Sequence, residues 1–269
     1  MKLSYNYKSL ELYSENNFEK KILSSKYLKT KLAYTIVNNP INGLKVIIKG
    51  NRCAVNLDEN KAFISEYLSK NQMGYMLRII IDSYVLSKNA LPLHSSMISI
   101  DSKSGFFFGG TNCGKTIFSN YIKNYNSGYK IIGDDHVIVA NKGIVGNRLS
   151  RIRSIDNESE LYLKNSQYLN SIKKYFIFDI DINDKINNYK ILNSDEYMEN
   201  DLSYVLKYLV YDFDIGQEVF KINEFIDYEV NLKYLLELRK FIDRANAIIK
   251  IRGSIEYVTK FINSIFISK

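Results

Sequence analysis

Between an apolar segment and an amphipathic one, the chain reads Gly109-Gly110-Thr111-Asn112-Cys113-Gly114-Lys115-Thr116. This run satisfies the phosphate-binding pattern G-x-x-x-x-G-K-[ST] at every fixed position. Residues 105–108 before it predict a strand and residues 117–125 after it predict a helix, which is the context that the pattern requires. Glycines let backbone N–H groups close around phosphate oxygens, and the start of a helix adds partial positive charge. The run therefore predicts a nucleoside triphosphate site.

Two side chains of this loop carry specific expectations. Lys115 is expected to reach the β- and γ-phosphates, and the Thr116 hydroxyl to face Mg²⁺. Cys113 is expected to contribute its backbone only. The plainer alternative is a glycine-rich turn closed by a capping threonine, which the flanking strand and helix disfavour.

An acidic pair, Asp134-Asp135, follows the apolar segment 129–132 and Gly133. One carboxylate at such a position can hold the metal that bridges the phosphates, and the other can take a proton from an attacking hydroxyl. We expect Asp134 to bind the metal and Asp135 to act as the general base, although the pattern alone leaves open which acid does which. Outside this context an Asp-Asp pair is usually a solvated turn.

Further candidates surround the two motifs. His94 and His136 are the only histidines of the chain, and His94 is the stronger candidate for a phosphate contact or a metal ligand. Glu158 and Glu160 fit a solvated acidic face better than a metal site. Six arginines could neutralise a transferred phosphoryl group, and no spacing rule selects among them: Arg148, Arg151, Arg153, Arg239, Arg244 and Arg252.

Composition sets the broad class. The 269 residues are 46% hydrophobic and 25% charged, which is ordinary for a globular protein and excludes a disordered or fibrous chain. The net charge of +8 suits anionic ligands, but no nucleic-acid motif accompanies it, so nucleic acid is not favoured as a partner. No apolar run is long enough for a signal sequence or a membrane span, and two distant cysteines suit a reducing compartment. We expect a cytoplasmic protein without membrane contact.

The positions of proline and other turn-forming residues predict a small N-terminal β+α portion over 1–88 and a nucleotide-binding catalytic domain over 89–269. In the first part, residues 44–48 and 52–55 predict a hairpin, and 58–87 predict two helices broken near 71–74. In the second part, 96–100 and 105–108 predict a hairpin that leads into the loop. Strands over 175–180 and 248–251 and helices over 232–247 and 255–265 are expected beyond it.

Three runs resemble one nucleotide site in order and spacing: residues 91–96 around His94, residues 106–116, and residues 131–135 with the acidic pair. Together they are similar to the site shared by HPr kinase/phosphorylase and ATP-dependent phosphoenolpyruvate carboxykinase. Only 19 residues separate Lys115 from Asp134, and the loop follows a hairpin, as is typical of that group. The resemblance implies an α/β fold with a P-loop core and a mixed sheet. It also implies site roles for His94, Lys115, Thr116, Asp134 and Asp135.

Departures from the pattern narrow the expected activity. The chain has no counterpart of the carboxykinase arginine segments, so decarboxylation is not expected, and residues 244–246 only echo the Arg-Asn pair of HPr kinase. The chain is more similar to smaller HPr-kinase-related proteins, which phosphorylate serine in a precursor peptide or free serine. We therefore expect an ATP- and Mg²⁺-dependent phosphotransferase acting on a serine-type hydroxyl of a peptide or protein.

Other interpretations stay open at this level. The acceptor could be free serine or another small hydroxylated metabolite, and the reaction could run backwards as a phosphorylase. A nucleotide-binding regulatory protein without catalysis is the alternative from another class, although such a protein would need fewer of these polar residues. Association into a homo-oligomer is compatible with the sequence.

Overall fold

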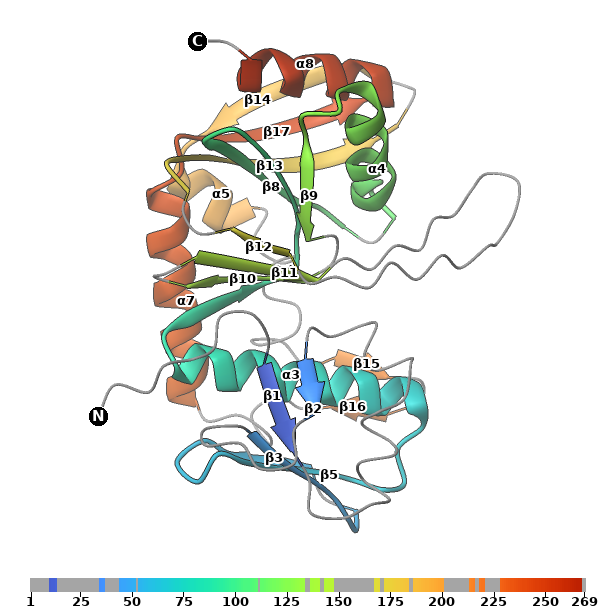
Figure 1. Cartoon of the computed structure of the whole chain (residues 1–269), viewed down its shortest axis with the longest axis vertical. Helices are drawn as coiled ribbons and strands as arrows, with labels where there is room; N and C mark the ends of the chain where they lie inside the picture. The colour runs from blue at the N-terminus through green and yellow to red at the C-terminus, as the bar shows by residue number, and fades with distance from the viewer. Residues whose placement is uncertain are drawn as a thin grey trace. The chain divides into compact units, whose positions relative to one another are not determined.

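The structure of the protein is a computed structural model, shown in Figure 1. It describes residues 10–13, 34–36, 44–51, 53–110, 112–133, 136–140, 143–147, 167–169, 172–183, 186–200, 213–215, 218–220 and 228–267. The chain forms two compact units. The first comprises Met1–Pro92, Ile138–Asn141 and Leu206–Glu237, and the second comprises Leu93–Val137, Lys142–Val205 and Leu238–Lys269. The first unit thus includes two segments from later in the sequence, 138–141 and 206–237. A single division of the chain at residue 88 does not place these segments with the N-terminal residues.

The first unit contains a five-stranded sheet of order β2-β1-β3-β5-β4. Its strands are β1 (Leu10–Tyr13), β2 (Tyr34–Ile36), β3 (Leu44–Ile48), β4 (Ala54–Asn56) and β5 (Lys61–Ile64). Alternate residues of β3 are buried, and they pack with residues of β5 and of helix α3 (Lys70–Ser87) in one apolar cluster. Ser69 caps this helix, because its hydroxyl accepts from the Gln72 amide while the Gln72 side chain accepts from the Ser69 amide.

Two expectations for this unit are wrong. The segments 44–48 and 52–55 do not pair as a hairpin, because β5 lies between β3 and β4, parallel to the former and antiparallel to the latter. Residues 61–64, expected in a helix, form that strand, which buries Ala62 and Ile64 beside β3. The helix has no break near 71–74. It starts at Lys70, where the Ser69 cap sets its first turn.

The second unit is built on a six-stranded mixed sheet of order β14-β17-β13-β8-β7-β9. Its strands are β7 (Ser96–Ile100), β8 (Lys103–Phe108), β9 (Lys130–Gly133), β13 (Lys174–Ile182), β14 (Asn188–Leu192) and β17 (Ala247–Gly253). Strands β8, β13 and β17 run parallel, whereas β7 is antiparallel to both β8 and β9 and β14 is antiparallel to β17. The predicted hairpin of β7 and β8 and the strands at 175–180 and 248–251 are confirmed.

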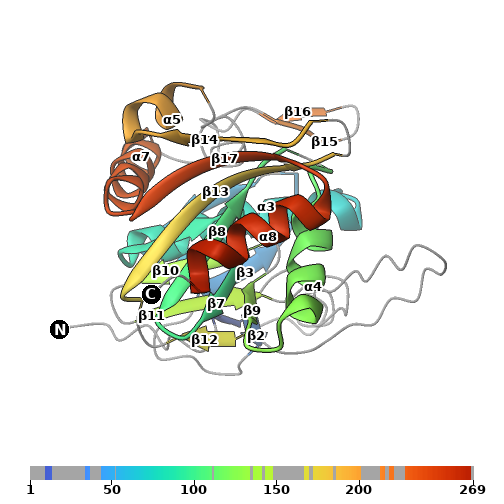
Figure 2. The same cartoon turned by 90° about the horizontal axis from the view of Figure 1, so that it is seen from above.

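Two helices, α4 (Lys115–Tyr125) and α8 (Ile255–Ile267), lie next to each other against this sheet (Figures 1 and 2). One apolar cluster joins them to β7, β8, β9, β13 and β17. Phe107 of β8 packs against Phe118 of α4 at 4.9 Å between ring centroids and stacks on Phe178 of β13 at 5.2 Å. Such aromatic pairs contribute about 0.5–1.5 kcal/mol each beyond their area burial. They hold β8 and α4, the two elements that flank the loop of residues 109–114, in a fixed relation.

The described residues form eight further elements. They are β6 (Ala90–Leu93), β10 (His136–Ala140), β11 (Gly143–Asn147), β12 (Gln167–Leu169), β15 (Phe213–Ile215), β16 (Glu218–Phe220), α5 (Ser194–Asn200) and α7 (Tyr228–Asp243). Helix α7 ends at Asp243, four residues before the end predicted for it, and Ala247 already belongs to β17. The described helices include none that is long and apolar enough to cross a membrane. The predicted α/β class with a mixed sheet is confirmed.

Candidate functional site

The loop between β8 and α4 turns through backbone conformations that favour glycine. Gly109 has φ +141°, Asn112 has φ +65° and Gly114 has φ +94°. Side chains with a Cβ rarely adopt these left-handed values, and asparagine is one of the residues that tolerates them. Thr111 lies outside the described residues. The fixed glycines of the pattern are therefore required by the path of the backbone.

Strand β13 lies alongside this loop and contacts it. It extends beyond the end of β8, because Asp179 pairs with Phe108 and residues 180–182 continue alongside the loop. The Ile182 amide donates to the Cys113 carbonyl at 2.9 Å. A Cβ on Gly114 would lie 2.6 Å from Cγ1 of Ile182. The loop is thus packed tightly against the last residues of β13, and its backbone has little freedom to move.

Gly109→Ala tests this close packing. A Cβ at Gly109 would lie 2.5 Å from the Ile180 carbonyl oxygen and 2.7 Å from the Cys113 sulfur, and the backbone atom cannot move aside as a flexible side chain can. Strained backbone and overpacking each cost about 1–3 kcal/mol. We expect Gly109→Ala to lower the free energy of unfolding by about 2–4 kcal/mol in urea titrations.

Gly50→Ala is the matched control for that variant. Gly50 also has a positive φ, +68°, but a Cβ there would meet nothing within 4 Å. Only the backbone cost remains, about 1–2 kcal/mol. Equal losses for the two variants would contradict tight packing at Gly109.

Lys115 is folded back over the loop that precedes it. Its ammonium donates to the carbonyls of Gly109 at 2.8 Å and Gly110 at 3.1 Å, and lies 3.5 Å from the Cys113 sulfur. The positive charge thus sits inside the span of the loop, where the pattern places it against phosphate oxygens. Cys113 is 8% exposed and supplies the carbonyl that Ile182 binds, and a backbone contact of Cys113 to a nucleotide stays a prediction.

The first turn of α4 presents donors that no side chain caps. Its N-cap residue is Gly114, and no side-chain hydrogen bond is made there. The first amides of a helix have no partner within the helix, so they point outward together with the positive end of the helix dipole. This arrangement fits an anion such as a phosphate group.

The same turn offers one protein ligand for a divalent metal. Thr116, partly buried, is the second residue of α4 and offers one hydroxyl. Across the described residues, no three His, Cys, Asp or Glu side chains gather as a metal cluster. Mg²⁺ in nucleotide sites is held by one or two protein groups plus substrate phosphates, so a dedicated cluster is not required.

Strand topology brings other predicted residues to the same edge of the sheet. Because β7 is antiparallel to β8, it starts where β8 ends: Ser96 pairs with Phe107, and the partly buried His94 precedes Ser96 by two residues. Strand β9 runs parallel to β8 and ends at Gly133, which pairs with Met97. The acidic pair, Asp134 and Asp135, follows Gly133 and lies outside the described residues. Its roles stay predictions.

Two ion pairs lie on β13 and β17, and of their four residues the sequence singled out Arg252 alone. Asp179 pairs in register with Lys250, and Asp181 with Arg252. The Asp179 carboxylate is 3.7 Å from the Lys250 ammonium, and the Asp181 carboxylate is 4.0 Å from Nε of Arg252. Opposite charges at i and i+2 in two apolar segments are a readable signal for such pairing, since both charges of each strand face the same side.

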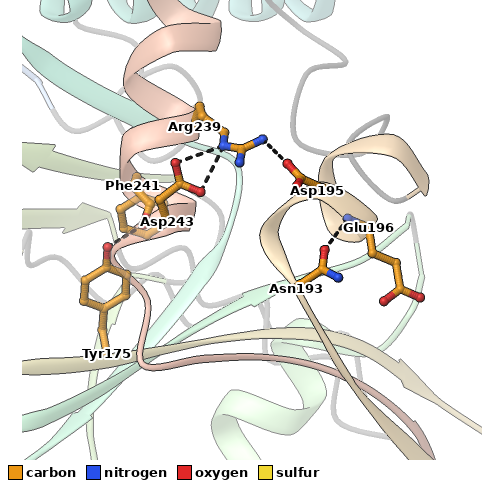
Figure 3. A network of polar contacts seen from close by, with 7 residues as sticks. All are labelled: Tyr175, Asn193, Asp195, Glu196, Arg239, Phe241 and Asp243. Atoms are coloured by element: carbon orange, nitrogen blue, oxygen red, sulfur yellow. Dashed lines mark hydrogen bonds and ion pairs between the residues drawn. The ribbon is translucent and has the colours of Figure 1, made fainter.

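The other predicted arginines are occupied or lie elsewhere. Arg239 of α7 donates through Nε to both carboxylate oxygens of Asp243 at 2.9 Å and lies 2.6 Å from Asp195 of α5 (Figure 3). Its hydrogen bonds to Asp243 and Asp195 raise the pKa of Arg239, and the bond from Arg239 lowers the pKa of Asp243. This network joins α7 to α5.

Arg244 is exposed and precedes β17, whose start lies at the opposite edge of the sheet from the loop. Arg148, Arg151 and Arg153, like Glu158 and Glu160, lie outside the described residues. His136 is 2% exposed in β10, so its ring is a buried packing residue rather than an open ligand.

A cavity of about 850 Å³ lies in the first unit. It is lined by Lys49, Ala54, Val55, Asn56, Leu57, Asp58, Phe63, Leu86, Ser87, Glu229, Val230 and Lys233. None of these residues belongs to the loop or to the candidate site around it.

The chain is similar to 49 chains of solved structures. A solved structure to which the chain is similar is the HPr(Ser) kinase/phosphatase from Coxiella burnetii, at 12% sequence identity and a TM-score of 0.27 over 64% of this chain and 91% of that chain. The strand order and the register of this chain's own sheets define its fold. No family model matches the sequence, and no curated protein matches it.

Proposed function

We propose that the chain is an ATP-dependent phosphotransferase that phosphorylates a serine-type hydroxyl, with a peptide or protein as the acceptor. The observation that carries the proposal is the loop of residues 109–116. The Lys115 ammonium lies within the span of the loop, and no side chain caps the start of α4. The loop lies at the edge of the sheet where β7 begins and β9 ends. Each of these features suits a triphosphate.

The residues divide the work as follows. Backbone amides of the loop and of the first turn of α4 bind phosphate oxygens, and Lys115 neutralises charge between the β- and γ-phosphates. His94 contacts the phosphates from the start of β7. Thr116 and Asp134 would hold Mg²⁺, which when bound supplies further neutralisation of the phosphate charge.

The proposed transfer step starts at Asp135. Its carboxylate takes the proton of the acceptor hydroxyl as the oxygen bonds to the γ-phosphorus. The bond from that phosphorus to the β–γ bridging oxygen breaks, and the electron pair stays on ADP. Holding donor and acceptor in line removes much of the entropic cost of their encounter.

A transfer assay tests the proposal. The purified chain is incubated with γ-labelled ATP and Mg²⁺, and with an acidic serine peptide, a neutral serine peptide or free serine. We expect label in a peptide at serine, and none after replacing Mg²⁺ with EDTA until Mg²⁺ is restored. Label in free serine alone would move the acceptor to small metabolites. Neither transfer nor hydrolysis with any acceptor would contradict the enzyme and favour a nucleotide-binding regulator.

A further inference from the structure

The edge of the sheet beside the loop is extended by two further strands. Strands β8, β13 and β17 are parallel neighbours, so their carboxyl ends meet at one edge. Ligands of open α/β sheets bind outside the carboxyl ends of the strands. Residues that close β13 and β17 therefore face the same region as the residues that follow β8.

Asp181 is placed against the loop by its two neighbours. The Ile182 amide binds the Cys113 carbonyl, and the Ile180 carbonyl oxygen lies 2.5 Å from where a Cβ on Gly109 would be. Asp181 therefore has a backbone fixed on both sides. Across the strand pair it faces Arg252, whose Nε lies 4.0 Å from its carboxylate.

Exposure distinguishes this outer pair from the inner one. The Asp179 and Lys250 side chains are 10% and 27% exposed, whereas those of Asp181 and Arg252 are 49% and 50% exposed. The inner pair is consistent with a structural role between two strands. Among the described residues, Arg252 has one long ion-pair contact, through Nε, and the other N–H donors of its guanidinium suit an anion.

We propose that Arg252, positioned by Asp181, is the catalytic cation that contacts the transferred phosphoryl group. Strand β13 lies between β17 and β8, so the backbone of β17 is two strand spacings, about 10 Å, from that of β8 along the carboxyl edge. A guanidinium there binds the equatorial oxygens of the group in transit in a planar, bidentate manner. The inference rests on the phosphotransferase function proposed above, and it selects Arg252 over the bound Arg239 and the distant Arg244.

Binding of a transition-state mimic tests this assignment without depending on turnover. The affinities of Mg²⁺–ADP alone and of Mg²⁺–ADP with aluminium fluoride are measured by calorimetry for the wild type, Arg252→Ala and Arg244→Ala. Aluminium fluoride stands for the phosphoryl group in transit. We expect Arg252→Ala to keep ADP affinity within about threefold and to lose about 100-fold in affinity for the fluoride complex. The control Arg244→Ala, which removes the same charge from the other end of β17, should match the wild type.

Two further variants separate a positioning role from a general structural one. Asp181→Asn should weaken the fluoride complex about tenfold in the wild type but add little to Arg252→Ala, because the two residues act as a unit. Arg252→Lys should restore part of the loss, and millimolar guanidinium should restore part of it in Arg252→Ala.

The outcomes are distinguishable from failure of the proposed function. The wild type could transfer no label while Arg252→Ala selectively loses affinity for the fluoride complex. That result would overturn the phosphotransferase function and keep Arg252 as a phosphoryl contact. Equal weakening of ADP and of the fluoride complex, or no change in either, would overturn the assignment of Arg252. A wild type that binds ADP but gains nothing from fluoride would overturn it as well.

Discussion

Lys115→Ala is expected to reduce phosphoryl transfer by at least about 1,000-fold in kcat/KM. The Lys115 ammonium already lies 2.8 Å and 3.1 Å from two carbonyls of the loop, so the charge is in place before a phosphate arrives. Removing one fixed donor from a transition state costs about 100- to 1,000-fold, and a full charge facing a triphosphate costs more. Hydrogen bonds to charged groups contribute about 1.5–3 kcal/mol, so ATP should also bind about 10- to 150-fold more weakly.

The measurements are steady-state kinetics with labelled ATP and calorimetric titration with ATP. Lys123→Ala is the matched control, because Lys123 is an exposed lysine in the last turn of the same helix. It should keep wild-type kinetics. Thermal melting of both variants shows whether the loop has stayed folded, and Lys115→Gln retains side-chain length if alanine loosens it. A Lys115→Ala protein with more than a tenth of wild-type kcat/KM would contradict the site.

Asp135→Asn is expected to lower kcat by about 100- to 10,000-fold while ATP binding stays within about threefold. Asparagine has a similar shape but cannot take a proton, and general base catalysis contributes factors of this size. An interaction made only in the transition state lowers kcat and kcat/KM together and leaves ground-state binding unchanged. Single-turnover transfer and ATP titration of the same preparation separate the two quantities.

Asp134→Asn serves as the comparison at the neighbouring carboxylate. If Asp134 holds the metal, its variant should need a higher Mg²⁺ concentration and recover part of its rate as that concentration rises. Asp101→Asn, an exposed carboxylate in the turn between β7 and β8, is the control and should behave as the wild type. Rescue of Asp135→Asn by Mg²⁺, with none for Asp134→Asn, would exchange the two roles.

The local parts of the site could be predicted from the sequence. The hairpin of β7 and β8, the loop of residues 109–116 and helix α4 lie within about 30 consecutive residues, and each is specified by its own glycines, alternation and helical spacing. The structure confirms these elements. It also gives the physical reason for the glycines, which is positive φ and the absence of space for a Cβ at Gly109 and Gly114.

Pairing between distant strands could not be predicted in the same way. Residues 61–64 were expected in a helix because Phe63 fits a helical spacing, yet this segment is a strand between β3 and β4. Its apolar side chains are buried by neighbours that the local pattern does not contain. The stability of a strand depends on how its side chains pack against the neighbouring strands. In this segment that packing outweighs the local helical pattern.

The phosphate-binding pattern of residues 109–116 could thus be recognised from the sequence alone, because the chemistry proposed for it depends on backbone freedom and on residues next to it in the chain. Only the tertiary structure distinguished Arg252 from the other described candidates, Arg239 and Arg244. By sequence Arg252 is one of six equal candidates, and the register of β13 and β17 places it opposite Asp181 at the carboxyl edge of the sheet. That register is set by burial across the whole sheet, and a shift by one residue would turn both charges to the other face.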